Sequence, residues 1–146
     1  MDEMNQLKVF TAEEANRLLP KLTEVIKELQ VNQEQVQAKE VEIDTLELLH
    51  PSGEGEKPSL AVAREIEKYN WLVNRFYSVL NEIHEMGCFL KDIEIGLVDF
   101  YGLYQGKVVY LCWKLGEPQV GFWHEVGSGY AYRQPLIQED EKESSG

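Results

Sequence analysis

The chain has 146 residues, of which 43% are hydrophobic and 27% are charged, as expected for one soluble globular domain. Its formal net charge is −12, from 26 acidic and 14 basic side chains. Such a charge disfavours nucleic acids and anionic membrane surfaces, because both are bound mainly through Lys and Arg. No apolar stretch is long enough to span a bilayer. We therefore expect a cytoplasmic protein that binds neither nucleic acid nor membranes.

The sequence contains only two cysteines, Cys88 and Cys112. Two are too few for a disulfide framework, and they do not form a CxxC pair. We expect both to be small buried thiols, which agrees with a cytoplasmic location.

The first part of the chain has helical periodicity. Thr11 and Glu14 have the spacing of a capping box, and apolar residues follow at helical intervals from Ala15 to Leu29. Pro20 falls inside this pattern and predicts a kink or a break. The expected result is a short first helix, followed by a long second helix that begins at Pro20.

A seven-residue repeat continues along the long helix, but Asn32 and Lys39 interrupt its apolar seam. This dilution favours a partly covered helix over a sustained coiled coil. Residues 50–58 are rich in glycine and proline and predict a loop. Ser59 then caps a second long helix, and Gly87 stands where that helix should end. Two long helices joined by a short loop predict an antiparallel hairpin.

The second long helix has apolar residues outside its main stripe: Trp71, Tyr77 and Val79. A second apolar surface needs a cover. We expect it to be covered by the sheet or by another subunit.

After Gly87 the sequence pattern becomes alternating, which is typical of strands. Residues 97–103, 107–115 and 119–126 predict three strands joined by turns. A segment through Tyr132 and Leu136 can add an edge strand.

The expected fold is therefore α+β: a long antiparallel helical hairpin with a short N-terminal helix, packed on a small three- to four-stranded antiparallel β-meander. Residues 1–137 would form a single domain, with a helical part at 11–87 and the meander at 88–137. The polar, acidic segment 138–146 predicts a disordered tail.

Two-residue loops at Gln105-Gly106 and Gly116-Glu117 would fix the strand register. One face would then be apolar and pack on the helices, carrying Val98, Phe100, Val109, Leu111, Trp113, Val120, Phe122 and His124. The other face would carry Asp99, Tyr101, Val108, Tyr110, Cys112, Gly121, Trp123 and Glu125. A slip of one residue in either loop would move one strand's residues to the opposite face.

The second face would hold an aromatic row of Tyr101, Tyr110 and Trp123. Such a row is too apolar to be left to water, so it predicts a pocket floor or a subunit interface. Asp99 beside it needs a partner, because a buried unpaired carboxylate is costly. Arg133 is the expected partner. The pair would either tie the C-terminal segment to the sheet or, with Glu125, flank a polar ligand.

Other kinds of site find little support. A general base or a metal site could draw on His124, Glu125, Asp99 and Cys112. His124 and Glu125 are neighbours on a predicted strand, however, so they point to opposite faces and cannot easily share a metal ion. No HExxH, CxxC or HxH spacing is present, and we expect no metal site and no cofactor. Asp99 beside Cys112 would disfavour a reactive thiolate. The glycines of 127–129 lack the lysine and following helix of a phosphate-binding loop.

Two regions resemble a known family. Residues 10–20 read FTAEEANRLLP, and residues 96–133 contain GLVDF, VYLCW, GEP and WHEV. Together they are similar to a small uncharacterised prokaryotic family, domain of unknown function 2203, over nearly the whole chain. The resemblance implies no activity. Members often carry Pro and basic residues after the Asp-Phe pair, where this chain has YGLY, so it implies no anion site dependent on them.

The leading functional hypothesis is a non-catalytic homo-oligomeric or protein-interaction module, since no coherent catalytic set emerges. The alternative is a small-molecule-binding protein or enzyme. Its polar site, built from Asp99, Trp123, Glu125 and Arg133, would lie over the aromatic sheet face.

Overall fold

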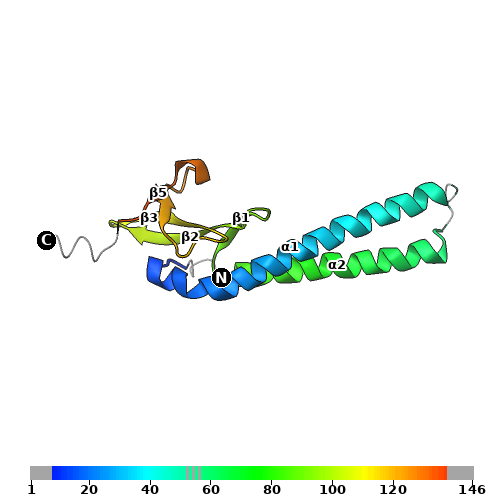
Figure 1. Cartoon of the computed structure of the whole chain (residues 1–146), viewed down its shortest axis with the longest axis horizontal. Coiled ribbons are helices and arrows are strands. Elements are labelled where there is room, and N and C mark those ends of the chain that lie inside the picture. The colour runs from blue at the N-terminus through cyan, green and yellow to red at the C-terminus, as the bar shows by residue number, and fades with distance from the viewer. Residues whose placement is uncertain (1–7, 52, 54, 56, 138–146) are drawn as a thin grey trace. The chain divides into compact units, whose positions relative to one another are not determined.

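The computed structural model describes residues 8–51, 53, 55 and 57–137. In this part of the chain it has two α-helices, one short 3₁₀ helix and a five-stranded sheet (Figure 1). The elements in order are α1 (Ala12–Leu49), α2 (Leu60–Glu85), β1 (Phe89–Asp92), β2 (Leu97–Tyr104), β3 (Lys107–Lys114), β4 (Phe122–His124), the 3₁₀ helix η2 (Tyr130–Tyr132) and β5 (Gln134–Pro135). The α+β class is confirmed. The disordered tail predicted at 138–146 lies outside the described residues.

Helix α1 begins as predicted but does not break. The amide of Thr11 donates to Glu14 Oε1 at 2.9 Å, and the amide of Glu14 donates to Thr11 Oγ1 at 3.0 Å, which confirms the capping box. The helix then continues through Pro20, so the predicted short first helix is wrong. Pro20 is exposed. The carbonyl that loses its amide donor there can be hydrated, which lowers the cost of proline inside a helix.

The chain divides into two compact units. The hairpin unit, Val25–Glu82, contains most of α1 and α2 in antiparallel order, and the remainder forms the sheet unit. Within the hairpin unit, Lys39 Nζ lies 2.6 Å from Glu65 Oε1, and an ion pair joins Glu28 to Arg75. Neither described helix combines the length and apolarity needed to cross a bilayer.

The sheet is an antiparallel meander in the order β1-β2-β3-β4-β5. Strand β5 lies in the segment where an edge strand was expected, whereas β1 was not predicted. Strand β1 has only four residues and no alternating pattern. The side chain of Asp92 ends it by accepting hydrogen bonds from the amides of Glu94 and Ile95, at 2.9 and 3.3 Å.

The predicted register of β2 and β3 is confirmed. Tyr104 pairs with Lys107 across the two-residue turn. The turn residues Gln105 and Gly106 have φ values of 52° and 84°. Positive φ at both positions gives the turn that best matches the twist of a hairpin.

The register of β3 and β4 differs from the prediction by one residue. Cys112 pairs with Phe122, and Tyr110 pairs with His124. The connection is longer than a two-residue hairpin, because β3 ends at Lys114 and β4 starts only at Phe122. Glu117 closes the first turn of this connection: its amide donates to the Lys114 carbonyl, and its Oε1 accepts from the Lys114 amide, both at 2.9 Å.

One face of the sheet forms the core of the sheet unit, as predicted for most of its residues. Its buried side chains include Val98, Phe100, Val109, Leu111 and Trp113. The Phe10 ring packs edge-on against Phe100 at 5.1 Å, and its amide donates to the Tyr101 carbonyl at 2.7 Å. Asn16 in the first turns of α1 accepts a hydrogen bond from the Val120 amide at 2.7 Å. We call this the inner face.

Candidate functional site

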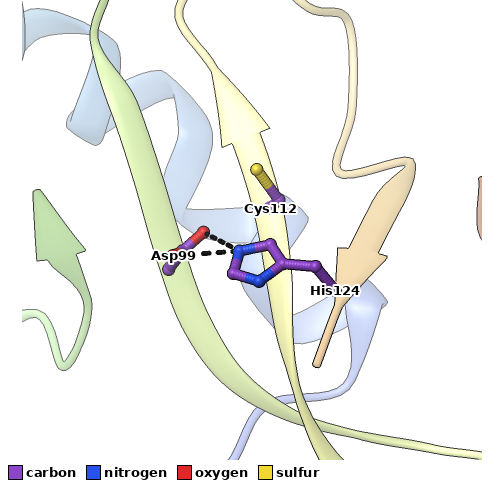
Figure 2. Close-up of side chains that lie close together, drawn as sticks. All are labelled: Asp99, Cys112 and His124. Carbon is purple, nitrogen blue, oxygen red and sulfur yellow. Dashed lines mark hydrogen bonds and ion pairs between the residues drawn. The ribbon is translucent and has the colours of Figure 1, made fainter. Parts of the chain in front are cut away.

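The opposite, outer face carries two rows of directly paired residues. Paired residues on neighbouring strands point to the same side of a sheet. The rows are Phe89, Asp99, Cys112 and Phe122, and then Tyr101, Tyr110 and His124. Asp99 on β2, Cys112 on β3 and His124 on β4 therefore meet on three neighbouring strands (Figure 2). The prediction that placed Phe122 and His124 in the core was wrong, because the register shift turns both side chains outward.

The two nitrogens of His124 have different partners. Nε2 lies 3.2 Å from each carboxylate oxygen of Asp99, and Nδ1 lies 2.9 Å from the carbonyl oxygen of Glu125. A carbonyl can only accept a hydrogen bond, so Nδ1 must carry a proton. Nε2 then faces two further acceptor oxygens. Since Asp99 and His124 are only 3% and 2% exposed, this contact needs a shared proton or a bound cation rather than water.

The buried setting shifts both acidic groups of the cluster toward their neutral forms. Burial raises the pKa of Asp99, and the neighbouring His124 opposes this shift. Burial, and then the charge of Asp99, raise the pKa of the Cys112 thiol to about 12. A thiol with such a pKa is a poor nucleophile near neutral pH. This agrees with the expectation that Cys112 is not a catalytic nucleophile.

Aromatic rings surround the cluster. Tyr101 and Tyr110 stack at 5.0 Å, Phe89 packs edge-on against Tyr101 at 5.2 Å, and Tyr110 lies 5.3 Å from the His124 ring. The predicted aromatic row therefore exists, but His124 stands where Trp123 was expected. These rings help to keep water away from Asp99.

Trp123 and Glu125 do not join this cluster. The Trp123 ring lies 5.1 Å from Tyr104, on the side opposite to His124. The carboxylate of Glu125 is exposed and pairs with Lys107 at 2.7 Å. The part of Glu125 that reaches the cluster is its backbone carbonyl, and no side-chain pattern in the sequence could reveal that role.

Arg133 does not pair with Asp99, contrary to expectation. Its guanidinium donates hydrogen bonds to both carboxylate oxygens of Glu117, at 3.2 and 2.5 Å. It also stacks over the Phe122 ring, 3.8 Å from the ring centroid. Its Nη1 also lies 3.9 Å from Cys112 Sγ. A two-pronged contact with a carboxylate is the arrangement that guanidinium favours. Arg133 thus ties the C-terminal segment to the sheet through Glu117, while His124 occupies the position beside Asp99.

The sheet unit also has a groove of about 560 Å³ next to the start of α1. Residues that line it include Thr11, Asn16, Tyr104, Leu111, Val120 and Leu136. None of the residues of the two outer-face rows named above is among its lining residues. This groove therefore gives no support to a ligand site over Tyr101 and Tyr110.

The hairpin unit has a separate groove of about 260 Å³, between α1 and α2. Gln33, Val36 and Gln37 line it from α1, and Tyr69, Val73, Phe76 and Tyr77 line it from α2. Trp71 and Tyr77 are 65% and 62% exposed, so two residues of the predicted second apolar surface face solvent, whereas Val79 is buried. Asn32 is only 6% exposed, and its Nδ2 has no hydrogen-bond partner among the described residues.

Replacing Asp99 tests the role of the buried contact. Asp99→Ala leaves His124 Nε2 without a partner and should lower the free energy of unfolding by about 3–5 kcal/mol. Asp99→Asn should cost much less, because its amide can donate to Nε2 while Nδ1 keeps its bond to the Glu125 carbonyl. Urea unfolding of the two variants and the wild type measures both values. Equal losses of unfolding free energy in the two variants would contradict the role assigned to the contact between Asp99 and His124.

The comparisons with known proteins place the chain in a family without adding an activity. Residues 8–136 match the model of a family described as an uncharacterized conserved protein, DUF2203. No curated protein and no solved structure matches the chain. The match covers most of the sequence, including both regions whose motifs resemble this family. The chain therefore belongs to the family DUF2203.

Proposed function

We propose that the protein is a non-catalytic module that self-associates through its helical hairpin. The observation that carries this proposal is the open groove of the hairpin unit, which Tyr69, Val73, Phe76 and Tyr77 line from α2. The proposed partner is the same hairpin of a second copy.

Two helices alone leave much of their apolar surface uncovered, whereas bundles of four bury it in a shared core. Here Tyr69, Val73 and Phe76 remain partly exposed along the groove, and Trp71 and Tyr77 are more exposed still. Full burial of one large apolar side chain is worth about 1.5–3 kcal/mol. Covering several of them in a second hairpin would offset the entropy lost on association.

Asn32 favours a second copy over an unrelated partner. It occupies a seam position of the seven-residue repeat, where a buried Asn typically pairs with its counterpart on a neighbouring helix. An unpaired buried amide costs about 1–3 kcal/mol. Because Nδ2 is buried within the single hairpin, the two Asn32 side chains of a two-fold symmetric pair would meet only if α1 and α2 move apart on association.

The other expectations about partners and location are part of this proposal. The net charge of −12 disfavours nucleic acid and anionic membranes as partners. Two buried free thiols, Cys88 and Cys112, support a reducing, cytoplasmic location. A polar ligand over the aromatic sheet face has less support, because Trp123 and Glu125 are turned away from Asp99.

A charge placed in the exposed apolar surface should prevent self-association. Tyr77→Glu puts a carboxylate at the groove and should give a monomer, because burying an unpaired charge is costly. Tyr132→Glu is the matched control, since Tyr132 is 71% exposed and belongs to the sheet unit. Sedimentation velocity over a range of protein concentrations measures the assembly. The wild type and Tyr132→Glu should form the same oligomer. A wild type that stays monomeric throughout would overturn the proposal.

Replacing Asn32 tests the choice of partner. Asn32→Leu removes the buried amide and should raise the free energy of unfolding by about 1–3 kcal/mol. It should also allow more than one oligomeric state, because the polar seam residue that selects the number of helices is lost. Gln35→Leu, at an exposed position of the same helix, should do neither. Native mass spectrometry measures the oligomeric state, and urea unfolding measures the free energy of unfolding. A single unchanged oligomer in Asn32→Leu would argue against pairing through this residue.

A further inference from the structure

We propose that Asp99, Cys112 and His124 bind one transition-metal ion, and that Zn²⁺ suits this site best. The three side chains each offer one ligand atom, and these atoms lie within 4.8 Å of one another. One nitrogen, one sulfur and one carboxylate oxygen form a ligand set typical of zinc rather than of magnesium or calcium. This proposal does not depend on the self-association of the hairpin.

The distance between His124 and Asp99 fits two ligands around one ion. Zinc binds nitrogen and oxygen at about 2.0–2.2 Å, so two such ligands at a tetrahedral angle are roughly 3.4 Å apart. His124 Nε2 lies 3.2 Å from both oxygens of Asp99. A charge-assisted N–H···O bond is normally shorter, at about 2.7–2.9 Å. The separation of 3.2 Å lies at the long end of the hydrogen-bond range and also fits two ligand atoms of one coordination sphere.

The backbone already holds His124 in the form that binds metal. The Glu125 carbonyl accepts a hydrogen bond from Nδ1, so the lone pair of Nε2 is free to point toward Asp99. Metal-binding histidines are usually oriented in this way, by a carbonyl or carboxylate on the nitrogen that does not touch the ion.

The charges of the cluster also fit a divalent ion. The Asp99 carboxylate and a Cys112 thiolate carry two negative charges, which balance Zn²⁺ in a site buried from water. Binding replaces the thiol proton and the proton shared by Asp99 and His124, so two protons leave as one ion enters. Arg133 lies near Cys112 Sγ, but Glu117 compensates its charge, so it does not exclude a cation.

The position of the ligands favours a structural role for the ion, in which the second carboxylate oxygen of Asp99 would complete the four ligands that such zinc sites have. The three ligands come from β2, β3 and β4, so one ion would tie three neighbouring strands together (Figure 2). Aromatic rings cover this part of the outer face. Such a site contributes its binding free energy directly to folding.

Cobalt titration of the chelator-treated full-length chain tests the site. Co²⁺ replaces Zn²⁺ in such sites and gives a thiolate-to-cobalt charge-transfer band. The wild type should show this band, saturating at one cobalt per chain, and one equivalent of Zn²⁺ should remove it. Cys112→Ser should lose the band. Cys88→Ser is the matched control, because Cys88 is also a buried free thiol, and it should keep the band.

Two results would overturn the proposal: no charge-transfer band in the wild type, or an equal band in Cys112→Ser. If Cys112→Ser does not fold, the wild type alone decides the question. Its unfolding temperature should rise with Zn²⁺ but not with Mg²⁺, and no rise with Zn²⁺ would reject the site. Tyr77→Glu should bind cobalt like the wild type, so a failure of self-association leaves this test unaffected.

Discussion

The hydrogen bond from Nδ1 of His124 to the Glu125 carbonyl determines what the outer face of the sheet can hold. It commits one ring nitrogen to the backbone, so the other meets the two oxygens of Asp99 at 3.2 Å. Away from water, this contact requires a positive partner between nitrogen and oxygen, either a proton or a metal ion. Cys112 lies beside it and adds a soft ligand. A single backbone contact thus creates a small polar centre within an aromatic face.

This centre exists only because of the register of β4, and the register depends on the turn that precedes it. Glu117 closes that turn through the Lys114 amide and also binds Arg133, which covers Phe122 and approaches Cys112. One acidic side chain therefore helps to position β4 and fastens the C-terminal segment over the site. The hairpin unit contributes a different property, an open groove lined by aromatic and apolar side chains of α2, so each of the two units supports its own proposal.

The features predictable from the sequence are those encoded by neighbouring residues. Thr11 and Glu14 start α1 through their own side chains, and Gln105-Gly106 fixes β2 against β3 because only a few residues take part. The predicted break of the helix at Pro20 was wrong, because helix propensity alone does not show that Pro20 is exposed to solvent. The grouping of Asp99, Cys112 and His124 was rejected from the sequence because the expected register placed His124 on the opposite face, and the three residues meet only in the observed register of three strands. The one signal in the sequence was Pro118, which indicates a connection between β3 and β4 longer than two residues. A longer connection changes the register and places His124 on the outer face.

The most direct measurement is the protonation of the two ring nitrogens of His124, read from their ¹⁵N chemical shifts in the metal-free, full-length protein. A proton on Nδ1 is predicted, because only a donor can bind the Glu125 carbonyl. Addition of one equivalent of Zn²⁺ should leave that proton in place and shift Nε2 to the value of a metal-bound nitrogen. A His124 that carries its only proton on Nε2, with Nδ1 bare, would contradict both the anchoring by Glu125 and the metal site that depends on it.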